Sequence, residues 1–300
     1  MSKSENLGLS SVAPSGTTLT VGTTRPAPSS MFKRVIARLA SGICGLPWGD
    51  YAIRLGAIIG ALMLWQWLSS NAIRFIVDFS NVPAPLDIGH QFVKLVGSAE
   101  FYKHITVSIQ RIIIAFSLAT CFGVIVGVFM GRSRVVHNII MPYIEIVRPI
   151  PAVAWIPMAI LMFPTEESSI IFITYLGAFF PIVLNTVHGV SQTDESLVRA
   201  ARSLGANNQA ILWHVILPGA LPSILAGLAI GMGVAWFSLL AGEIISGQYG
   251  IGYFTWRSYT LVEYHNIIIG MLTTGLLGTL STWLVMQVSK PALRWQEARH

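Results

Sequence analysis

The sequence predicts an all-α protein that crosses a membrane about six times. Of its 300 residues, 53% are hydrophobic and only 11% are charged, and the mean hydropathy is +0.65. A soluble domain carries roughly 25% charged residues, so this chain cannot cover its surface with polar groups and must meet lipid over part of it. A helix needs about 20 apolar residues to cross the hydrocarbon core. Six segments meet that need, at 51–70, 105–130, 140–163, 169–189, 222–246 and 265–289.

Two features of these segments predict how they fold and pack. The third segment is interrupted by prolines, which break a membrane helix unless neighbours satisfy the freed carbonyl groups. The first, second and fifth segments carry glycines four residues apart, which let helices approach one another closely. The glycines are Gly56 and Gly60 in the first segment, Gly123, Gly127 and Gly131 along the second and at its end, and Gly227 and Gly231 in the fifth.

The positions of lysine and arginine predict the orientation, because these residues accumulate on the cytoplasmic side of a membrane. Both termini and the loop near 191–221 are therefore expected in the cytoplasm. Arg54, Arg111 and Arg148 lie near segment ends and are left out of the comparison. The inner set is Lys3, Arg25, Lys33, Arg34, Arg38, Arg132, Arg134, Arg199, Arg202, Lys290, Arg294 and Arg299, and the smaller outer set is Arg74, Lys94, Lys103 and Arg257.

The two ends of the chain are expected to lie outside the membrane. In residues 1–48, the first thirty or so are rich in Ser, Thr, Gly and Pro and lack the apolar surface needed to fold. The remainder of that stretch is basic and amphipathic, and residues 291–300 form a short cytoplasmic tail. The two cysteines, Cys44 and Cys121, predict neither a disulfide framework nor a metal site.

A polar segment at 191–221 interrupts the apolar pattern and predicts two short helices. Asp194 can cap the first helix and Gly205 can end it in the left-handed conformation. Asn207 can cap the second. A slim, polar-tipped helix pair of this kind suits a groove on a soluble partner, or it can lie on the lipid headgroups.

Two prolines follow this helix pair. Pro218 and Pro222 are expected to end the second helix after about Ile216 and to begin the next span.

The stretch "RAARSLGANNQAILWHVILP" resembles the EAA signature of ABC importer permeases. That signature is Glu-Ala-Ala, three residues, Gly, nine residues and Ile-x-Leu-Pro. Arg199 stands at the Glu position and reverses its charge, and Val215 replaces the Ile. The matching residues are Ala200, Ala201, Gly205, Leu217 and Pro218.

Other stretches resemble the nitrate, sulfonate, taurine and bicarbonate branch of this permease family. They are "HITVSIQRIIIAFSLATCFGVIVGVFMG", "PYIEIVRPIPAVAWIPMAILMF" and "GEIISGQYGIGYFTW". The likeness covers about residues 50–290. It implies an importer transmembrane domain over 49–290, with a coupling loop at about 191–221, in the inner membrane.

The resemblance also implies partners. Members of the family work as two permease chains, here expected to be identical, with two cytoplasmic ATPases that bind ATP and Mg²⁺ and with an external solute-binding protein. The helices of the coupling loop dock in the ATPase cleft. The residues that the resemblance assigns to this coupling are Arg199, Ala200, Ala201, Gly205, Asn207, Leu217 and Pro218.

The chain itself is expected to have no catalytic residues, no cofactor and no bound metal. A P-loop needs a lysine after a glycine, and none of the five lysines follows one. There is also no nucleophile elbow and no HExxH motif, and the histidines are scattered. The basic residues flank apolar runs instead of clustering among polar residues, which argues against a nucleic-acid partner.

Candidates for the solute path are polar or bulky residues inside the spans, because charged groups there usually face the bundle interior. Glu243 is either a structural partner of an outer-loop cation such as Arg257 or a gate residue. Arg148, near the cytoplasmic part of the third span, either attracts an anion or anchors the helix at the inner surface. The other candidates are Asn185, a polar residue in the fourth span, Trp155 and Trp236, which are packing or gate residues, and Pro149 and Pro151, which are expected to pack on the coupling loop.

The sequence therefore indicates a permease subunit that moves a small anion inward by alternating access. Taurine or an alkanesulfonate is the favoured solute, and nitrate or bicarbonate is also possible. The alternative is a stand-alone secondary transporter of small organic anions. Such transporters often contain internal repeats, and no convincing repeat is visible in this sequence.

Overall fold

The computed structural model describes residues 48–71 and 81–293, and all regular secondary structure in these ranges is helical. The chain divides into two units, residues 1–61 and 62–300. Helix α2 begins in the first unit and ends in the second. Of the expected N-terminal segment 1–48 only the last residue is described, and most of the expected tail 291–300 also lies outside the described residues.

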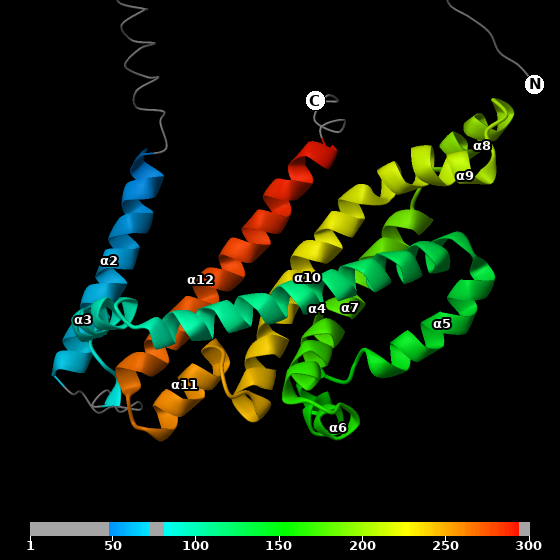
Figure 1. Cartoon of the computed structure of the whole chain (residues 1–300). Coiled ribbons are helices and arrows are strands. Elements are labelled where there is room, and N and C mark those ends of the chain that lie inside the picture. Colours follow the sequence, from blue (N-terminus) through cyan, green and yellow to red (C-terminus); the bar gives the residue numbers. More distant parts are fainter. Residues whose placement is uncertain (1–47, 72–80, 294–300) are drawn as a thin grey trace, which may run out of the picture. The chain divides into compact units, whose positions relative to one another are not determined.

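Five described helices are long and apolar enough to cross a membrane, and a bent pair makes up to six. These long helices and the short helices that connect them are shown in Figure 1. In chain order the elements are α2 (Trp48–Ser70), α3 (Pro85–Val96), α4 (Ala99–Arg132), α5 (Arg134–Val147), η2 (Ala152–Trp155), α6 (Ile156–Met162), α7 (Glu166–Ser191), α8 (Glu195–Ser203), α9 (Asn208–Ile211), η3 (Leu212–Ile216), α10 (Leu217–Ser246), α11 (Ile251–Thr260), α12 (Tyr264–Ser289) and η4 (Lys290–Leu293).

The third expected span, 140–163, is not one straight helix. Helix α5 ends at Val147, and the η2–α6 pair leaves it at an angle of 86°. Pro149 and Pro151 lie in the break, where their rings and missing N–H groups prevent a helix from continuing. The other expected spans are confirmed as α2, α4, α7, α10 and α12.

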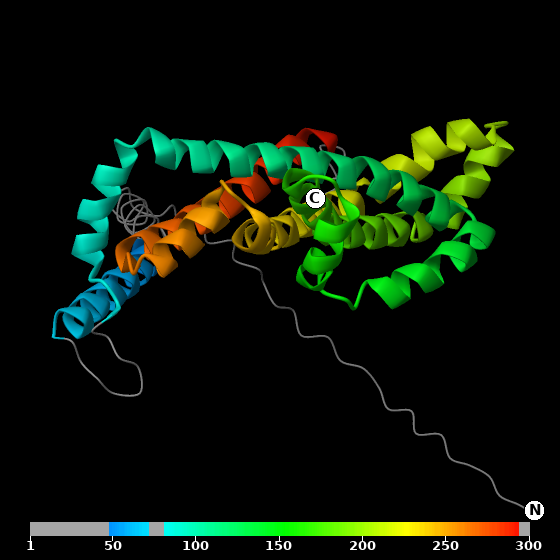
Figure 2. The same ribbon diagram turned by 60° about the horizontal axis from the view of Figure 1, so that its bottom comes forward.

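Helices α4, α7 and α10 form the centre of the bundle, and glycines set their spacing. A Cβ atom on Gly127 of α4 would lie 2.5 Å from the Cβ of Thr186 in α7, so the two backbones touch at a position where only a hydrogen fits. Figure 2 shows the long helix α4 crossing α7 and α10. The predicted stripes of α4 and α10 are confirmed, since Gly123, Gly131, Gly227 and Gly231 also pack directly on α7. The pair Gly56 and Gly60 lies in the other unit of the chain and stays a prediction.

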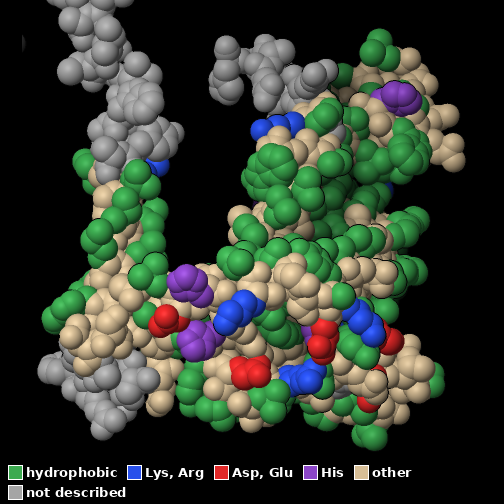
Figure 3. All heavy atoms as spheres, turned by 60° about the vertical axis from the view of Figure 1, so that its left-hand side comes forward, with side chains coloured by type: hydrophobic (Ala, Val, Ile, Leu, Met, Phe, Trp, Pro, Cys, Tyr) green, Lys and Arg blue, Asp and Glu red, His purple; other side chains and the backbone are tan. Residues whose placement is uncertain are grey.

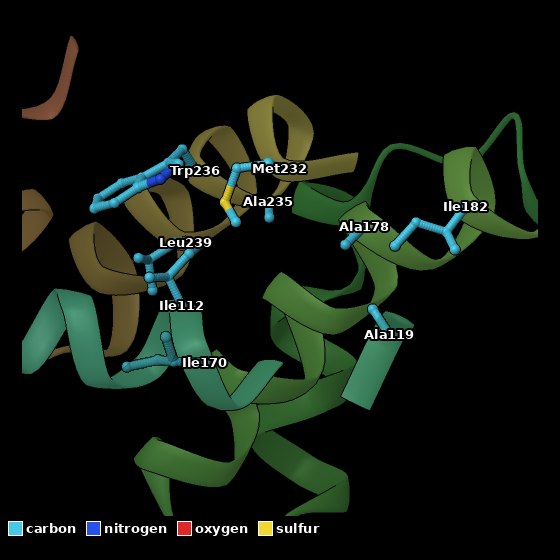
Figure 4. Packing of buried hydrophobic residues seen from close by; sticks show 9 residues of the cluster. All are labelled: Ile112, Ala119, Ile170, Ala178, Ile182, Met232, Ala235, Trp236 and Leu239. Carbon is cyan, nitrogen blue, oxygen red and sulfur yellow. The ribbon is translucent and has the colours of Figure 1, made fainter. Parts of the chain in front are cut away.

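The core between these three helices is apolar. Figure 4 shows its side chains pointing toward one another from α4, α7 and α10. The cluster consists of Ile112, Ala119, Ile170, Ala178, Ile182, Met232, Ala235, Trp236 and Leu239. Its members from α10 recur at helical spacing, so one face of that helix meets the bundle.

The connections place two different regions at opposite ends of the central helices. Helices α8 and α9 follow the C-terminal end of α7 and precede α10 (Figure 1). The loop from α10 to α11 and the N-terminal parts of α4 and α7 lie at the other end. On the face in Figure 3, acidic, basic and histidine side chains gather along one edge below a largely hydrophobic surface.

The sequence predicted that the second helix of the 191–221 segment ends before the next span. The structure shows that it does not. Helix α9 continues through η3, a π-helical turn, into α10 without a break. Pro218 lies in the first turn of α10, directly after the wider turn, where a proline is tolerated. Pro222 lies inside α10, so neither proline ends a helix.

Candidate functional site

The predicted caps of the two-helix segment, α8 and α9, are confirmed. The Asp194 carboxylate accepts a hydrogen bond of 2.8 Å from the Ser196 backbone N–H at the start of α8. That hydrogen bond, together with the Ser196 hydroxyl, holds the pKa of the Asp194 carboxyl below its ordinary value. The Asn207 side chain accepts 2.7 Å from the Ala210 N–H and caps α9. Both helices therefore begin at the residues that the sequence indicated.

The turn between α8 and α9 depends on a glycine. Gly205 has a φ of +86°, which favours glycine because it has no Cβ. Its N–H donates to the Arg202 carbonyl at 2.9 Å, and the Ala206 N–H donates to the Ala201 carbonyl at 3.0 Å. This is the Schellman arrangement, which satisfies the last carbonyls of a helix. The turn is thus a fixed corner.

The two-helix segment is buried on one side and exposed on the other. Ile211 is fully buried, and Val198 and Ala201 of α8 pack against the cluster around it. On the outside, Leu204 is 89% exposed at the turn, and Trp213 of η3, just after α9, is 67% exposed. Large exposed apolar side chains at and near this rigid corner suit contact with another surface.

A basic groove lies beside this segment. It has a volume of about 650 Å³ and runs between α8 and the junction of α4 with α5. Arg199, the residue that stands at the Glu position of the EAA signature, is one of its lining residues. The other charged or titratable lining residues are Arg132, Arg134, His137, Glu195 and Arg202.

At the opposite end of the bundle, Glu243 is buried in an ion network. Its carboxylate accepts hydrogen bonds from the Arg111 guanidinium at 3.0 Å and from the Ser108 hydroxyl at 2.7 Å. Of the two readings of Glu243, the structure shows the ion pair with a cation, but the cation is Arg111 of α4 and not Arg257. Arg257 instead donates to Glu100 at 2.9 Å on the surface, because Arg257 lies in the second turn of α11, beyond the loop that folds over Glu243.

Arg111 joins four segments of the chain. Besides Glu243 of α10, it donates to the Glu167 carboxylate at the start of α7 and, at 2.6 Å, to the Tyr249 carbonyl in the loop before α11. The Gly252 N–H completes the shell of Glu243 with a hydrogen bond of 2.9 Å. A buried charge needs such complete pairing, so the network fixes the relative positions of these segments.

The sequence interpretation missed Arg111 and Glu167. Arg111 is the seventh residue of the expected 105–130 segment, but helix α4 begins at Ala99, which makes Arg111 the thirteenth residue of that helix. An arginine within an apolar run is costly unless paired, and that position alone was a signal. Its partner could not be identified in the same way, because Glu243 lies 132 residues further along the chain.

A cavity of about 590 Å³ lies between the α5–η2 break, α7 and α10. It brings together three of the predicted path residues, Arg148, Pro151 and Asn185. Its α7 residues begin at Leu176 and its α10 residues at Ile230, so the cavity lies along the middle of both helices.

Two expectations about this region are corrected. Arg148 does not lie near the end of the bundle that carries α8, because the 14 residues of α5 lead away from that end, a length of about 21 Å at 1.5 Å per residue. For the same reason the break with Pro149 and Pro151 does not pack on the two-helix segment, but faces the middle of α7 and α10.

Three of the remaining candidates lie elsewhere, and Pro149 lies in the break between Arg148 and Pro151 without lining the cavity itself. Trp236 is buried in the core, where its indole N–H donates to the Ser281 hydroxyl at 2.7 Å. Trp155 packs near Ile156 in another apolar cluster. Glu243 is separate from the residues that line the cavity. The seven candidate path residues therefore do not form a single site.

Comparison with known proteins finds a matching family profile and several similar proteins. Residues 119–299 match the sequence profile described as "binding-protein-dependent transport system inner membrane component". The chain is 37% identical over 198 residues to the taurine transport system permease protein TauC of Escherichia coli, covering 64% of this chain and 72% of that protein. It is 34% identical over 248 residues to the putative aliphatic sulfonates transport permease protein SsuC of the same organism, covering 81% and 91%. It is 30% identical over 233 residues to the nitrate import permease protein NrtB of a Synechocystis species, covering 75% and 82%.

Proposed function

Because this chain belongs to the binding-protein-dependent transport system inner membrane components, as an ABC importer permease of the nitrate, sulfonate and taurine branch, we propose that it moves a small anion into the cell by ATP-driven alternating access. It is the membrane subunit of a larger transporter. A separate ATPase, which binds ATP and Mg²⁺, supplies the energy, and a binding protein on the outer face delivers the solute.

The observation that carries this proposal is the rigid corner formed by α8 and α9. Its two caps and the Schellman turn at Gly205 fix its shape. Its underside is packed into the bundle through Ile211, and α9 continues through η3 into α10. A push on the exposed tip would therefore pass directly into a membrane-spanning helix. This arrangement supports a role for α8 and α9 as the coupling helices that the ATPase moves.

The basic groove supports a particular kind of ATPase contact. Where the EAA signature has a glutamate, Arg199 lines a groove with three further arginines. An ATPase surface with acidic side chains would complement this charge. The reversed charge at Arg199 would then be matched by a reversed charge on the partner.

The orientation of the subunit follows from the same contact. The end with α8 and α9 lies in the cytoplasm, as the distribution of arginine and lysine favours. The end with the Glu243 network faces outward, where the binding protein docks. A second copy of the permease completes the path as a homodimer. The subunit therefore spans the inner membrane several times with both termini inside.

The solute is a small sulfonate, with taurine or an alkanesulfonate favoured over nitrate or bicarbonate. The taurine and aliphatic sulfonate permeases among the similar proteins support this order. The nitrate permease is somewhat less similar, at 30% identity.

Reconstitution tests the proposal. The permease would be co-expressed with its ATPase, purified as a complex and placed in liposomes with the loaded binding protein. Uptake of taurine, methanesulfonate, nitrate and bicarbonate would be measured with and without ATP. ATP-dependent uptake by the complex is expected. Uptake by the permease alone, driven by an ion gradient, would instead identify a secondary transporter and contradict the proposal.

A further inference from the structure

We propose that the cavity between the α5–η2 break, α7 and α10 is an anion-binding station within the permease, in which Arg148 is the binding cation. This inference rests on the proposed function, because it describes how the transported anion is held on its way across. The ligand class is a small oxyanion, such as a sulfonate, that accepts several hydrogen bonds at one end.

The charge balance of the cavity carries the inference. Arg148 is the only charged side chain among its lining residues. Among the residues that the structure describes, no hydrogen bond or ion pair engages its guanidinium. The contrast with Arg111 is direct, since that buried arginine is paired with two carboxylates. Arg148, in contrast, is exposed at the cavity, so its charge is open to a mobile anion, and no carboxylate lines the cavity to balance it.

The position of Arg148 excludes a simpler role. Positively charged residues near the cytoplasmic surface often only anchor a helix. Arg148 instead follows the last residue of α5, about 21 Å along that helix from its start, and faces the middle of α7 and α10. A guanidinium at this depth is useful for binding because its forked donors match the oxygens of a sulfonate or nitrate.

Two neutral groups on the cavity wall can add hydrogen bonds. The Asn185 amide donates one hydrogen to the Pro181 carbonyl at 2.8 Å, which leaves its second hydrogen for a ligand. The Ser238 side chain is only 1% exposed, and its hydroxyl has no partner among the described residues. Thr174 and Thr186, in comparison, bond back to carbonyls four residues earlier.

The backbone that lines the cavity also supports an anion-binding site. Irregular backbone is tolerated at membrane depth only where it is buried in protein or lines a water-filled cavity. The α5–η2 break supplies such backbone at Ile150, Pro151 and Ala152, all of which line the cavity. The rest of the wall is mainly apolar, including Phe180 and Phe237. Arg148 is exposed on this wall, so an anion in the cavity can reach its guanidinium directly.

The test uses the reconstituted complex with loaded binding protein and the same four anions as probes. Arg148→Gln is expected to lower the uptake rate about tenfold or more, while ATP hydrolysis stimulated by the binding protein stays near that of the wild type. The uptake rate of Arg148→Lys is expected to lie between that of the wild type and that of Arg148→Gln. Lys94→Gln removes one exposed positive charge that does not line the cavity, and it should leave uptake unchanged.

Charge rescue separates binding from a folding defect. With Cys44 and Cys121 replaced by serine, Arg148→Cys would be treated in the assembled complex with three thiol reagents. One adds an ethylammonium group, one a neutral methyl group and one an ethylsulfonate group. Only the ethylammonium reagent is expected to restore uptake. Equal rescue by the neutral reagent, or full uptake by Arg148→Gln, would overturn the inference while leaving the proposed function intact. A wild-type complex that moves none of the anions would overturn both.

Discussion

The Arg111 guanidinium of α4 donates a 3.0 Å hydrogen bond to the Glu243 carboxylate of α10, and both side chains are almost fully buried. Glu167 of α7 holds the same guanidinium from a second side. The three central helices are therefore tied by charge at one end, whereas at the other end α7 is linked to α10 through α8 and α9. The bundle therefore has an ion network that joins its helices at one end, called the joint below, and the exposed corner of α8 and α9 at the other.

Removing the cation of this joint should be costly. Arg111→Met leaves the Glu243 and Glu167 carboxylates without their shared partner, and breaking a buried ion pair costs about 3 kcal/mol or more. The free energy of unfolding in mixed detergent micelles would show this loss. Arg257→Met is the matched control, because its pair with Glu100 is exposed and should contribute less than about 1 kcal/mol. Equal losses for the two variants would contradict the assignment.

The contact between α4 and α7 should not tolerate a methyl group at Gly127. A Cβ there would lie 2.5 Å from Thr186, so Gly127→Ala forces the helices apart at a cost of about 1–3 kcal/mol. Gly233→Ala is the control, because nothing lies within 4 Å of a Cβ at that position. Within a helix this second change should be neutral or stabilising by up to about 1 kcal/mol. The same unfolding titration compares them, and a stable Gly127→Ala variant would argue against close packing.

The corner at Gly205 should control coupling more than assembly. Gly205→Val places a branched side chain at a φ of +86°, which strains the turn by about 1–2 kcal/mol and shifts the exposed tip. The reconstituted complex is expected to lose transport per ATP hydrolysed. Gly205→Asn should retain most of it, since asparagine tolerates this conformation. Two variants with the same ratio of transport to hydrolysis would exclude a dependence on the turn.

Trp236 should behave as a packing residue. Trp236→Phe keeps an aromatic ring but removes the hydrogen bond to Ser281, at a cost of about 1 kcal/mol. Uptake should stay close to that of the wild type, because Trp236 does not line the cavity with Arg148. Trp213→Phe changes an indole that is 67% exposed and should leave stability unchanged. A large loss of uptake in a stable Trp236→Phe protein would show that this residue gates the path.

Features that depend on neighbouring residues could be predicted from the sequence. The long apolar runs predicted the five spans. Asp194 and Asn207 predicted where α8 and α9 begin, because a capping side chain bonds to a backbone group within three residues. The glycine stripe at Gly123, Gly127 and Gly131 also predicted a contact, although it did not identify α7 as the partner.

Features that depend on the packing of distant segments could not be predicted. The pairing of Arg111 with Glu243 joins residues on two helices far apart in the chain, and no local pattern indicates it. The depth of Arg148 depends on the direction in which α5 leaves α4. The prediction that Pro218 ends a helix was wrong, because the effect of a proline depends on its position in the helix. Pro218 lies in the first turn of α10 and is accommodated by the π-helical turn before it.

The most direct test of the account asks which side of the membrane α8 and α9 face. A single cysteine at Asn208, in a chain whose Cys44 and Cys121 are replaced by serine, would be exposed to a membrane-impermeant maleimide. The account predicts labelling in inside-out vesicles and not in right-side-out vesicles, with protection when the ATPase is bound. Labelling only in right-side-out vesicles would place the corner outside the cell and contradict the coupling of this permease to a cytoplasmic ATPase.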